Sequence, residues 1–549
     1  MKRLVLCTTA LILAAPAAFA LDCDDRLTPE AMGLTGVTFT EVAALPAGDE
    51  SPAAQCRIRA RTAERTGSDG KPYALSFELA LPDDWNGDFV HQFNGGNDGA
   101  VVPATGGRLT GTGETSALAR GYAVVSSDAG HDGKANPDLG LAGGAAFGFD
   151  FEARQMYGYK AVAVLQPLAL QMVAAFYGQP AGRSYGIGCS NGGRHAMVAA
   201  ARMPDAFDGL LIGAPGFNLP RAGIQHALDV QSFAKVNADI RQAFSPADLR
   251  LVADGILASC DALDGLSDGL VNDTAACQAS FDITSLQCAE GQNSACLSAP
   301  QVQALQTIHA GPRGGDGQQL YSDWAWDPGI AGADWRSWKL ESTIPPWDNM
   351  PIIAVMGAAS QAQIFTVPPT RVGGSPADLV QFLLEFDIAA QAGRIEATDD
   401  QFPQSPMQVM APPGADDPEL ADFRDAGGKM ILYHGVADAV FSVNDTARWY
   451  DRLNANNDGA AASFARFYPM PGMNHCDGGP ATEVVDLLTP LVEWVEAGTP
   501  PEAITAAAHP ESADLPETLQ GATRPLCPAP QVARYQGGDE KSAASFQCK

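Results

Sequence analysis

A serine between glycines, at residues 188–192, is the feature that most constrains how this chain can fold. Gly188-Cys189-Ser190-Asn191-Gly192 matches the pattern Gly-x-Ser-x-Gly, which places a serine on a tight turn between a strand and a helix. Glycines flank such a turn because side chains would clash where the backbone folds sharply back. The chain has 57 glycines, so the pattern carries weight only if its neighbours form that strand and that helix.

The segments around the serine supply both elements. Apolar and alternating runs predict strands, and apolar residues at helical spacing predict helices. The predicted strands cover residues 74–81, 122–126, 184–188 and 209–213, and the predicted helices cover residues 153–177 and 194–203. Strands that alternate with helices are typical of an α/β fold built on a parallel sheet.

This alternation stops between residues 217 and 426 and then resumes. Further strands are predicted at 429–433 and 464–468, whereas the segment before them has a cysteine-rich part followed by a tryptophan cluster. The cluster contains five of the eight tryptophans: Trp324, Trp326, Trp335, Trp338 and Trp347. An insertion between two parts of one sheet explains this order. We expect a first part at 21–216, an inserted domain at 217–426 and a second part at 427–549.

The N-terminus has the three parts of a secretory signal. Lys2 and Arg3 precede an apolar run at residues 4–15, and Ala18-Phe19-Ala20 provides the small residues of a cleavage site. We expect residues 1–20 to be removed and the protein to be secreted or periplasmic. No later apolar run reaches the roughly 18 residues that span a bilayer, so no membrane association is expected.

Charge and cysteine content narrow the class of protein. A formal net charge of −30 repels phosphate backbones, so nucleic acid is not an expected partner. Of the 11 cysteines, Cys7 lies in the signal, and the even number that remains indicates disulfides in an exported protein. A zinc site is the alternative, but no Cys-x-x-Cys pair occurs. The number of cysteines does not fix the disulfide connectivity.

A serine nucleophile needs a base, and the base needs an acid that orients it. Asp438 follows the predicted strand at 429–433, and His475 lies on a loop after the last predicted strand. Taken singly, each is equally explained as a helix cap or a surface loop residue. However, Cys189 precedes the serine and Cys476 follows the histidine. A disulfide between them would bring Ser190 and His475 side by side, because paired cysteines have Cα atoms roughly 5.5 Å apart.

Together these residues resemble the tannase and feruloyl esterase family, which also contains terephthalate monoester hydrolases. The matching segments are Cys189-Ser190, Asp438, His475-Cys476, Gly121-Tyr122-Ala123-Val124-Val125, Ser126-Ser127-Asp128-Ala129-Gly130-His131, Ser184-Tyr185-Gly186, Gly192-Gly193-Arg194, Ala206-Phe207-Asp208-Gly209 and Gly213-Ala214-Pro215. The resemblance implies an α/β-hydrolase fold, with a lid inserted between the serine strand and the aspartate strand. It also implies five disulfides: Cys23–Cys56, Cys189–Cys476, Cys260–Cys277, Cys288–Cys296 and Cys527–Cys548.

The resemblance further implies a structural calcium ion in the lid and no organic cofactor. The loop at residues 260–270 is rich in aspartate and glycine, and calcium prefers carboxylate and carbonyl oxygens on a tightly turning chain. The implied ligands are the carboxylates of Asp261, Asp264 and Asp268 and the carbonyl groups of Leu266 and Leu270. From spacing alone, a solvated turn explains the same loop.

An oxyanion hole is expected beside the nucleophile. Its first donor is the N–H of Asn191, the residue after the serine. Its second donor is expected from the loop at residues 93–98, with Gly96 preferred to Gly95. His434 and Phe441 fall where relatives place residues that line the substrate cleft. His434 is equally explained as a histidine at a strand end whose ring nitrogens are satisfied by hydrogen bonds.

The resulting hypothesis is an esterase that cleaves aromatic acyl esters of the feruloyl or galloyl type through an acyl-enzyme. One or two of the clustered tryptophans are expected to line the acyl pocket. A terephthalate monoester hydrolase is the alternative, but neither Arg336 nor Arg371 lies in a motif that identifies it as the required carboxylate-binding arginine. A non-catalytic, calcium-stabilised binding protein is a second alternative, which the intact set of Ser190, Asp438 and His475 disfavours. The oligomeric state is not predicted.

Overall fold

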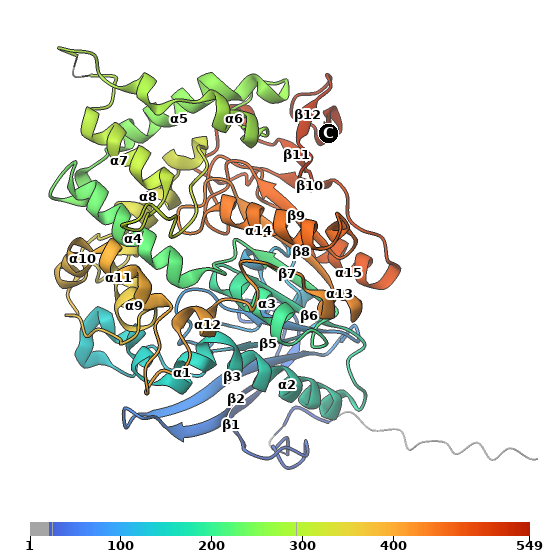
Figure 1. Cartoon of the computed structure of the whole chain (residues 1–549). Coiled ribbons are helices and arrows are strands. Elements are labelled where there is room, and N and C mark those ends of the chain that lie inside the picture. The colour runs from blue at the N-terminus through green and yellow to red at the C-terminus, as the bar shows by residue number, and fades with distance from the viewer. Residues whose placement is uncertain (1–20, 25, 293) are drawn as a thin grey trace, which may run out of the picture.

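The computed structural model describes residues 21–24, 26–292 and 294–549. A nine-stranded sheet forms the centre of the molecule, with strand order β1-β2-β3-β5-β4-β6-β7-β8-β9 (Figure 1). The pairs β1–β2, β2–β3 and β3–β5 are antiparallel, and every pair from β5 to β9 is parallel. This arrangement confirms the predicted α/β architecture. The proposed signal peptide, residues 1–20, lies outside the described residues.

The predicted strands and helices are present with small shifts at their ends. The central strands are β1 Val37–Leu45, β2 Gln55–Thr66, β3 Pro72–Pro82, β4 Phe89–Phe93, β5 Ala123–Ser127, β6 Ser184–Cys189, β7 Gly209–Gly213, β8 Lys429–Gly435 and β9 Ala465–Met470. The helices of the same part are α1 Phe151–Gln155, α2 Ala161–Tyr177, α3 Asn191–Arg202, α14 Val443–Asn456 and α15 Leu488–Ala497. Helix α3 begins three residues before the predicted start, because the turn at Ser190 leads directly into it.

The two faces of the parallel strands bury different cores. In β7, Leu210 and Ile212 pack into the cluster formed with α3 and α14, whereas Leu211 packs on the opposite side with Leu491 and Trp494 of α15. Neighbouring side chains of a strand point to opposite faces. A strand covered on both faces therefore reads as a continuous apolar run, and this explains why β7 was recognisable from its sequence.

Residues 217–426, here called the lid, connect β7 to β8, although these two strands are neighbours in the sheet. The lid contains α4 Leu219–Ala234, α5 Pro246–Cys260, α6 Thr274–Ser280, α7 Ala299–Ala310, α8 Ala333–Lys339, α9 Ala358–Gln363, α10 Pro376–Glu385, α11 Ile388–Gln391, α12 Pro406–Met410 and α13 Ala421–Asp425. Most of it gathers at one side of the sheet, at the left and top of Figure 1. One large core cluster joins the lid helices to Phe441 of the central part.

The C-terminal segment forms two small hairpins and completes the disulfide set. These hairpins pair β10 Ile504–Ala507 with β11 Thr523–Leu526, and β12 Ala533–Tyr535 with β13 Phe546–Cys548. All five disulfides that the resemblance implied are present in the structure. Such a set is typical of a protein that folds in an oxidising compartment outside the cytosol.

Among the described residues, one helical stretch is long and apolar enough to cross a membrane by length and composition alone. This stretch, Phe151–Tyr177, includes α2, whose Leu165, Met172 and Val173 are fully buried against the sheet. A core helix of this kind meets the same length and composition criteria.

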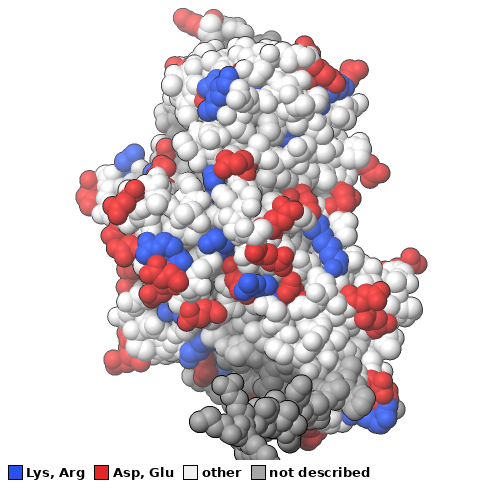
Figure 2. All heavy atoms as spheres, turned by 90° about the vertical axis from the view of Figure 1, so that its right-hand side faces the viewer, with Lys and Arg blue, Asp and Glu red and all other residues white. Residues whose placement is uncertain are grey.

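On the face shown in Figure 2, lysine and arginine side chains lie interspersed with acidic ones.

Candidate active site

Ser190 occupies the tight turn that its flanking glycines predict. It has φ 65° and ψ −126°, a backbone conformation that is uncommon for a residue with a side chain. A Cβ atom added to Gly188 would lie 2.8 Å from the backbone of Gly192, and one added to Gly192 would lie 2.5 Å from the carbonyl oxygen of Phe93. Both contacts are shorter than packed atoms allow, so the turn requires glycine at these two positions.

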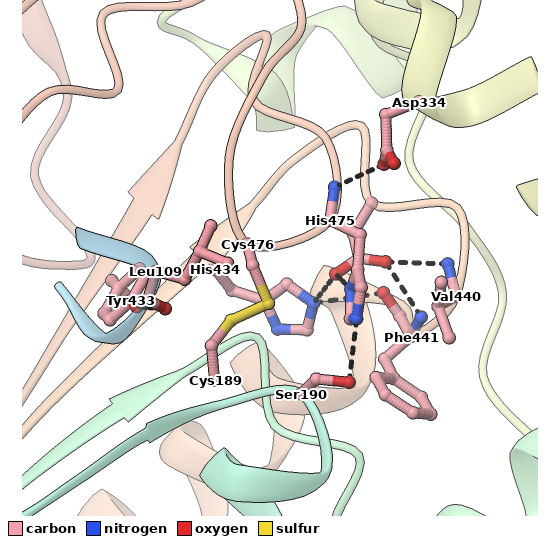
Figure 3. Close-up of a disulfide and its surroundings, with 11 residues drawn as sticks. Leu109, Cys189, Ser190, Asp334, Tyr433, His434, Val440, Phe441, His475 and Cys476 are labelled. Carbon is pink, nitrogen blue, oxygen red and sulfur yellow. Dashed lines mark hydrogen bonds and ion pairs between the residues drawn. A yellow bond between two sulfur atoms is a disulfide. The ribbon is translucent and has the colours of Figure 1, made fainter. Parts of the chain in front are cut away.

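The structure brings the three predicted catalytic residues into one hydrogen-bonded chain (Figure 3). The Oγ atom of Ser190 lies 2.8 Å from Nε2 of His475, and Nδ1 of His475 lies 2.7 Å from Oδ2 of Asp438. An ionised carboxylate can only accept hydrogen bonds, so Nδ1 of His475 bears the proton that it donates to Asp438. Nε2 then has a free lone pair, which accepts from the hydroxyl group of Ser190. This is the arrangement that a serine nucleophile and its base require.

The carboxylate of Asp438 is buried and fixed from several sides. Its Oδ1 atom accepts hydrogen bonds from the backbone N–H groups of Val440 and Phe441, at 2.7 and 3.0 Å. Burial alone would raise the pKa of Asp438, but the neighbouring His475 and His434 outweigh it and hold the pKa below its usual range. Asp438 is therefore ionised at neutral pH, as an acid that orients an imidazole must be.

His434 supports Asp438 and does not line an open cleft, which corrects its predicted role. Its side chain is fully buried, with Nδ1 2.9 Å from Thr446 Oγ1 and Nε2 3.0 Å from the carbonyl oxygen of Phe441. The same Nε2 atom lies 3.2 Å from Oδ2 of Asp438. Since Nε2 faces only acceptors, it bears the proton and adds a donor beside the acid. In the sequence, a histidine at the end of a strand is compatible with lining the cleft and with a buried position beside the acid, so the sequence could not separate these two roles.

Aromatic rings and acidic groups surround His475. The ring of Phe441 lies 5.6 Å from the imidazole and that of the lid residue Trp338 lies 5.1 Å away, both measured between centroids and both edge-on. Burial would lower the pKa of His475, but the charge of Asp438 and its hydrogen bond raise it, with smaller contributions from Asp334 and Asp477. The net pKa of His475 is raised.

The disulfide Cys189–Cys476 lies directly beside this chain of hydrogen bonds (Figure 3). It joins the residue before Ser190 to the residue after His475, across 287 positions of sequence, with Cα atoms 6.0 Å apart. The bond therefore links the end of β6 to the histidine loop, where the hydroxyl group and the imidazole must stay in contact.

The glycine loop predicted to complete an oxyanion hole passes beside Ser190. A Cβ atom added to Gly95 would lie 3.7 Å from that of Ser190, and Gly96 follows with φ 62°. The loop is fixed by Asp98, whose Oδ2 atom accepts from the amide of Asn191 at 2.8 Å and lies 2.9 Å from Nε2 of His195. The side chain of Asn191 therefore points into this buried network, which leaves its backbone N–H as the group available for an oxyanion.

Of the clustered tryptophans, Trp338 is the one with a ring contact to His475. Trp326 instead stacks on His309, with ring centroids 3.6 Å apart, inside the lid. The two arginines considered as carboxylate-binding groups have other partners: Arg336 donates to the carbonyl groups of Phe244 and Arg241, and Arg371 lies over the ring of Phe149. Arg336 also pairs with Glu341 at 2.9 Å, so its guanidinium group is held inside the lid. Arg371 is exposed, and its ring contact leaves its N–H groups open to solvent.

The lid loop predicted to bind calcium has a suitable donor set, although its carboxylates have protein partners. Asp261 accepts from the N–H groups of Asp268 and Gly269, Asp264 accepts from the side chain of Asn272, and Asp268 pairs with Arg524. Within the described part of the chain, no three histidine, cysteine or acidic side chains gather as a metal-binding group.

Two backbone carbonyl groups of the same loop are available as ligands. Those of Leu266 and Leu270 accept no hydrogen bond from the described residues. Gly265 and Gly269 have φ 102° and 93°, so the chain turns tightly here. Three carboxylates and two such carbonyl groups fit calcium in their chemistry.

Sequence reasoning missed two acidic side chains that contact the site. Asp98 is separated by 97 positions from its partner His195, and Asp334 of α8 accepts from the backbone N–H of His475 across 141 positions. Asp334 stands in no motif, and its distance along the chain from His475 left no local pattern to follow. For Asp98, the adjoining glycine loop was the available signal.

Comparison with known proteins identifies relatives along nearly the whole chain. A family model described as tannase and feruloyl esterase matches residues 56–549. The chain is 42% identical over 521 residues to the mono(2-hydroxyethyl) terephthalate hydrolase of Piscinibacter sakaiensis, which covers 90% of this chain and 84% of that protein. It is 29% identical over 489 residues to a probable feruloyl esterase of Arthroderma benhamiae, with 86% and 82% covered.

Solved structures show the same fold. The crystal structure of feruloyl esterase B from Aspergillus oryzae superposes with a TM-score of 0.72 at 23% identity, covering 94% of this chain and 97% of that one. The tannin acyl hydrolase from Aspergillus niger superposes with a TM-score of 0.62 at 21% identity, covering 94% and 92%. The lid and the central sheet are thus shared with known α/β-hydrolases. The chain belongs to the tannase and feruloyl esterase family, and it is a carboxylic ester hydrolase.

Proposed function

We propose that this protein hydrolyses aromatic acyl esters through a covalent acyl-enzyme on Ser190. The observation that carries the proposal is the hydrogen-bonded chain from Ser190 through His475 to Asp438, at 2.8 and 2.7 Å. His475 removes the hydroxyl proton as Ser190 Oγ attacks the ester carbonyl carbon, and it then protonates the leaving alkoxide. Water, activated by the same imidazole, next attacks the acyl-serine and releases the acid.

The negative charge that develops on the carbonyl oxygen needs donors that are already in place. We assign the N–H of Asn191 and an N–H of the loop at Gly95 and Gly96 to this role. The position of that loop beside Ser190 supports the assignment. The hydrogen bond from the side chain of Asn191 to Asp98 also supports the assignment, because it fixes the loop. A donor that is already in place costs no free energy of reorientation during the reaction.

The proposed acyl group is a single aromatic ring of the hydroxycinnamoyl or galloyl type. Trp338 and Phe441 flank His475 with apolar rings, and aromatic groups gain from ring contacts as well as from burial. A terephthalate monoester is the second candidate, because a relative of that name is 42% identical to this chain. Recognition of its free carboxylate calls for an arginine. Arg336 is paired with Glu341, and Arg371 is exposed over the ring of Phe149.

A panel of three esters distinguishes these candidates. We expect kcat/KM for methyl ferulate or methyl gallate to exceed that for a terephthalate monoester by at least about tenfold, which corresponds to about 1.4 kcal/mol of differential transition-state binding. Initial rates at equal enzyme concentration, measured by liquid chromatography of the released acid, provide the comparison. A preference of the same size for the terephthalate monoester would transfer the assignment to the second candidate.

We also propose that the loop at residues 260–270 takes up calcium as a structural ion. The ligands would be Asp261, Asp264 and Asp268 with the carbonyl groups of Leu266 and Leu270, and the oxygen chemistry of this set supports the proposal. When bound, the ion would supply positive charge to a loop that contains three carboxylates. Export after cleavage behind Ala20 is proposed as well, and the five disulfides support it.

Chelation tests the calcium proposal. A ligand present at 100 times its dissociation constant stabilises the folded state by about 2.7 kcal/mol, so EDTA is expected to lower Tm by several degrees and added calcium to restore it. The variant Asp264→Asn should show a low Tm that neither reagent changes. Asp254→Asn, an exposed aspartate of α5, should respond to EDTA as the native protein does. If EDTA leaves the Tm of the native protein unchanged, the loop holds no stabilising ion.

A further inference from the structure

The lid contacts the histidine loop at several points between residues 327 and 338. The carboxylate of Asp327 accepts from the backbone N–H of Gly472 at 3.1 Å, and the carbonyl oxygen of Gly329 accepts from the side-chain amide of Asn474 at 3.0 Å. Both acceptors are buried, as is Asn474. This part of the lid is therefore bonded to the loop that presents the base.

The last of these hydrogen bonds reaches the base itself. Oδ2 of Asp334, in the first turn of α8, accepts from the backbone N–H of His475 at 3.1 Å (Figure 3). One helical turn later, Trp338 lies edge-on against the imidazole of the same residue, at 5.1 Å between centroids. Helix α8 thus contacts both the backbone and the ring of His475.

The carboxylate of Asp334 is available for this contact because a different carboxylate accepts the hydrogen bond from the first N–H group of α8. The N–H of Ala333 donates to Asp514 at 3.0 Å, whereas the side chain of Asp334 accepts from His475. We propose that Asp334 is a positioning residue for His475, which holds the backbone of the base and adds a negative charge that favours its protonated form. The inference rests on the proposed function of His475 as the general base.

The charges around His475 match this geometry. Four titratable groups bear on the imidazole: Asp438 with His434 behind it, Asp334 from the lid, and Asp477 from the histidine loop itself. Desolvation raises the pKa of Asp334 to about 6, and His475 opposes that rise. Asp334 is therefore ionised above about pH 6, and over that range its charge helps to keep the pKa of His475 raised.

The sign of the pH effect follows directly. His475 accepts the serine proton only when it is neutral, so kcat/KM rises with pH through the pKa of His475. Loss of a nearby negative charge destabilises the imidazolium and lowers that pKa. Variants without the Asp334 charge should therefore reach full activity at lower pH than the native protein does.

Three substitutions of Asp334 separate the effect of its charge from the effect of its hydrogen bond. In Asp334→Asn the amide oxygen can still accept from the His475 N–H, but the negative charge is lost. We therefore expect the acidic limb of the pH profile of kcat/KM, measured with a p-nitrophenyl ester, to move to lower pH by about half a unit. In Asp334→Ala the hydrogen bond is lost too, and we expect the same movement with kcat about tenfold lower. In Asp334→Glu the charge is kept, and the limb should return towards its native position.

Asp514→Asn is the matched control. It removes the same charge from a group bonded to the same helix, without a contact to His475, and its acidic limb should coincide with that of the native protein. Active-site titration with a serine-directed phosphonate verifies that each variant is folded. If the limb of Asp334→Asn coincides with that of Asp514→Asn, Asp334 does not act through His475. Activity that survives Ser190→Ala would instead contradict the proposed function itself.

Discussion

Replacing Ser190 with alanine will leave a folded protein whose kcat on aryl esters is lower by a factor on the order of 10⁴ to 10⁶. The reason is geometric: the hydroxyl group is the atom that His475 Nε2 contacts at 2.8 Å, and no covalent intermediate can form without it. The ratio of the two kcat values is obtained from the hydrolysis of a p-nitrophenyl ester, followed for hours with the variant and for seconds with the native protein.

The stability of this variant separates chemistry from folding. Alanine at φ 65° is as strained as serine, so Tm should stay within about 1 °C of the native value. Ser280→Ala, a matched change at an exposed serine of α6, should change neither Tm nor kcat. Turnover that persists in Ser190→Ala at a tenth or more of the native rate would show that another group is the nucleophile.

Removing the disulfide beside the site should affect stability and activity together. In the double variant Cys189→Ser with Cys476→Ser, the unfolded chain regains the freedom of a loop that spans 287 positions. Loop-closure entropy assigns about 6 kcal/mol to a bond of that span. We expect a large fall in Tm, together with a kcat at least about tenfold lower, because the hydroxyl group and the imidazole lose their covalent tether.

The disulfide Cys288–Cys296 provides the control for this effect. It closes a separation of only 8 positions within the lid, for which the same entropy argument gives about half the stabilisation. Its removal should lower Tm less and leave kcat unchanged. Equal losses of activity in the two double variants, or full activity without Cys189–Cys476, would contradict a specific role of the tether at the site.

The site could be predicted from sequence because each part of it carries a local signal. Ser190 stands in a glycine pattern with a structural cause, Asp438 follows the end of a buried strand, and the cysteines beside Ser190 and His475 indicate that distant loops meet. The parallel strands were equally recognisable, since burial on both faces makes them continuously apolar. Where the chemistry of a turn or strand demands particular residues, one sequence was sufficient.

The lid could not be predicted to the same depth. Its helices do have start signals: Ser245, Ser298, Ser375 and Ser405 each form a reciprocal capping box with the residue three positions later. These signals mark where helices begin but not where they pack. The contacts of Asp334 and Trp338 with His475 depend on that packing, so they emerge only in three dimensions.

Covalent trapping identifies the nucleophile of this protein directly. Native protein is treated with an aryl phosphonate that reacts with activated serines, and the modified residue is located by mass spectrometry of its peptides. We predict one label per chain, on Ser190, with complete loss of ester hydrolysis and no label when Ser190 or His475 is replaced by alanine. A label on a different residue, or turnover that continues after Ser190 is fully modified, would contradict the role of Ser190 as the nucleophile.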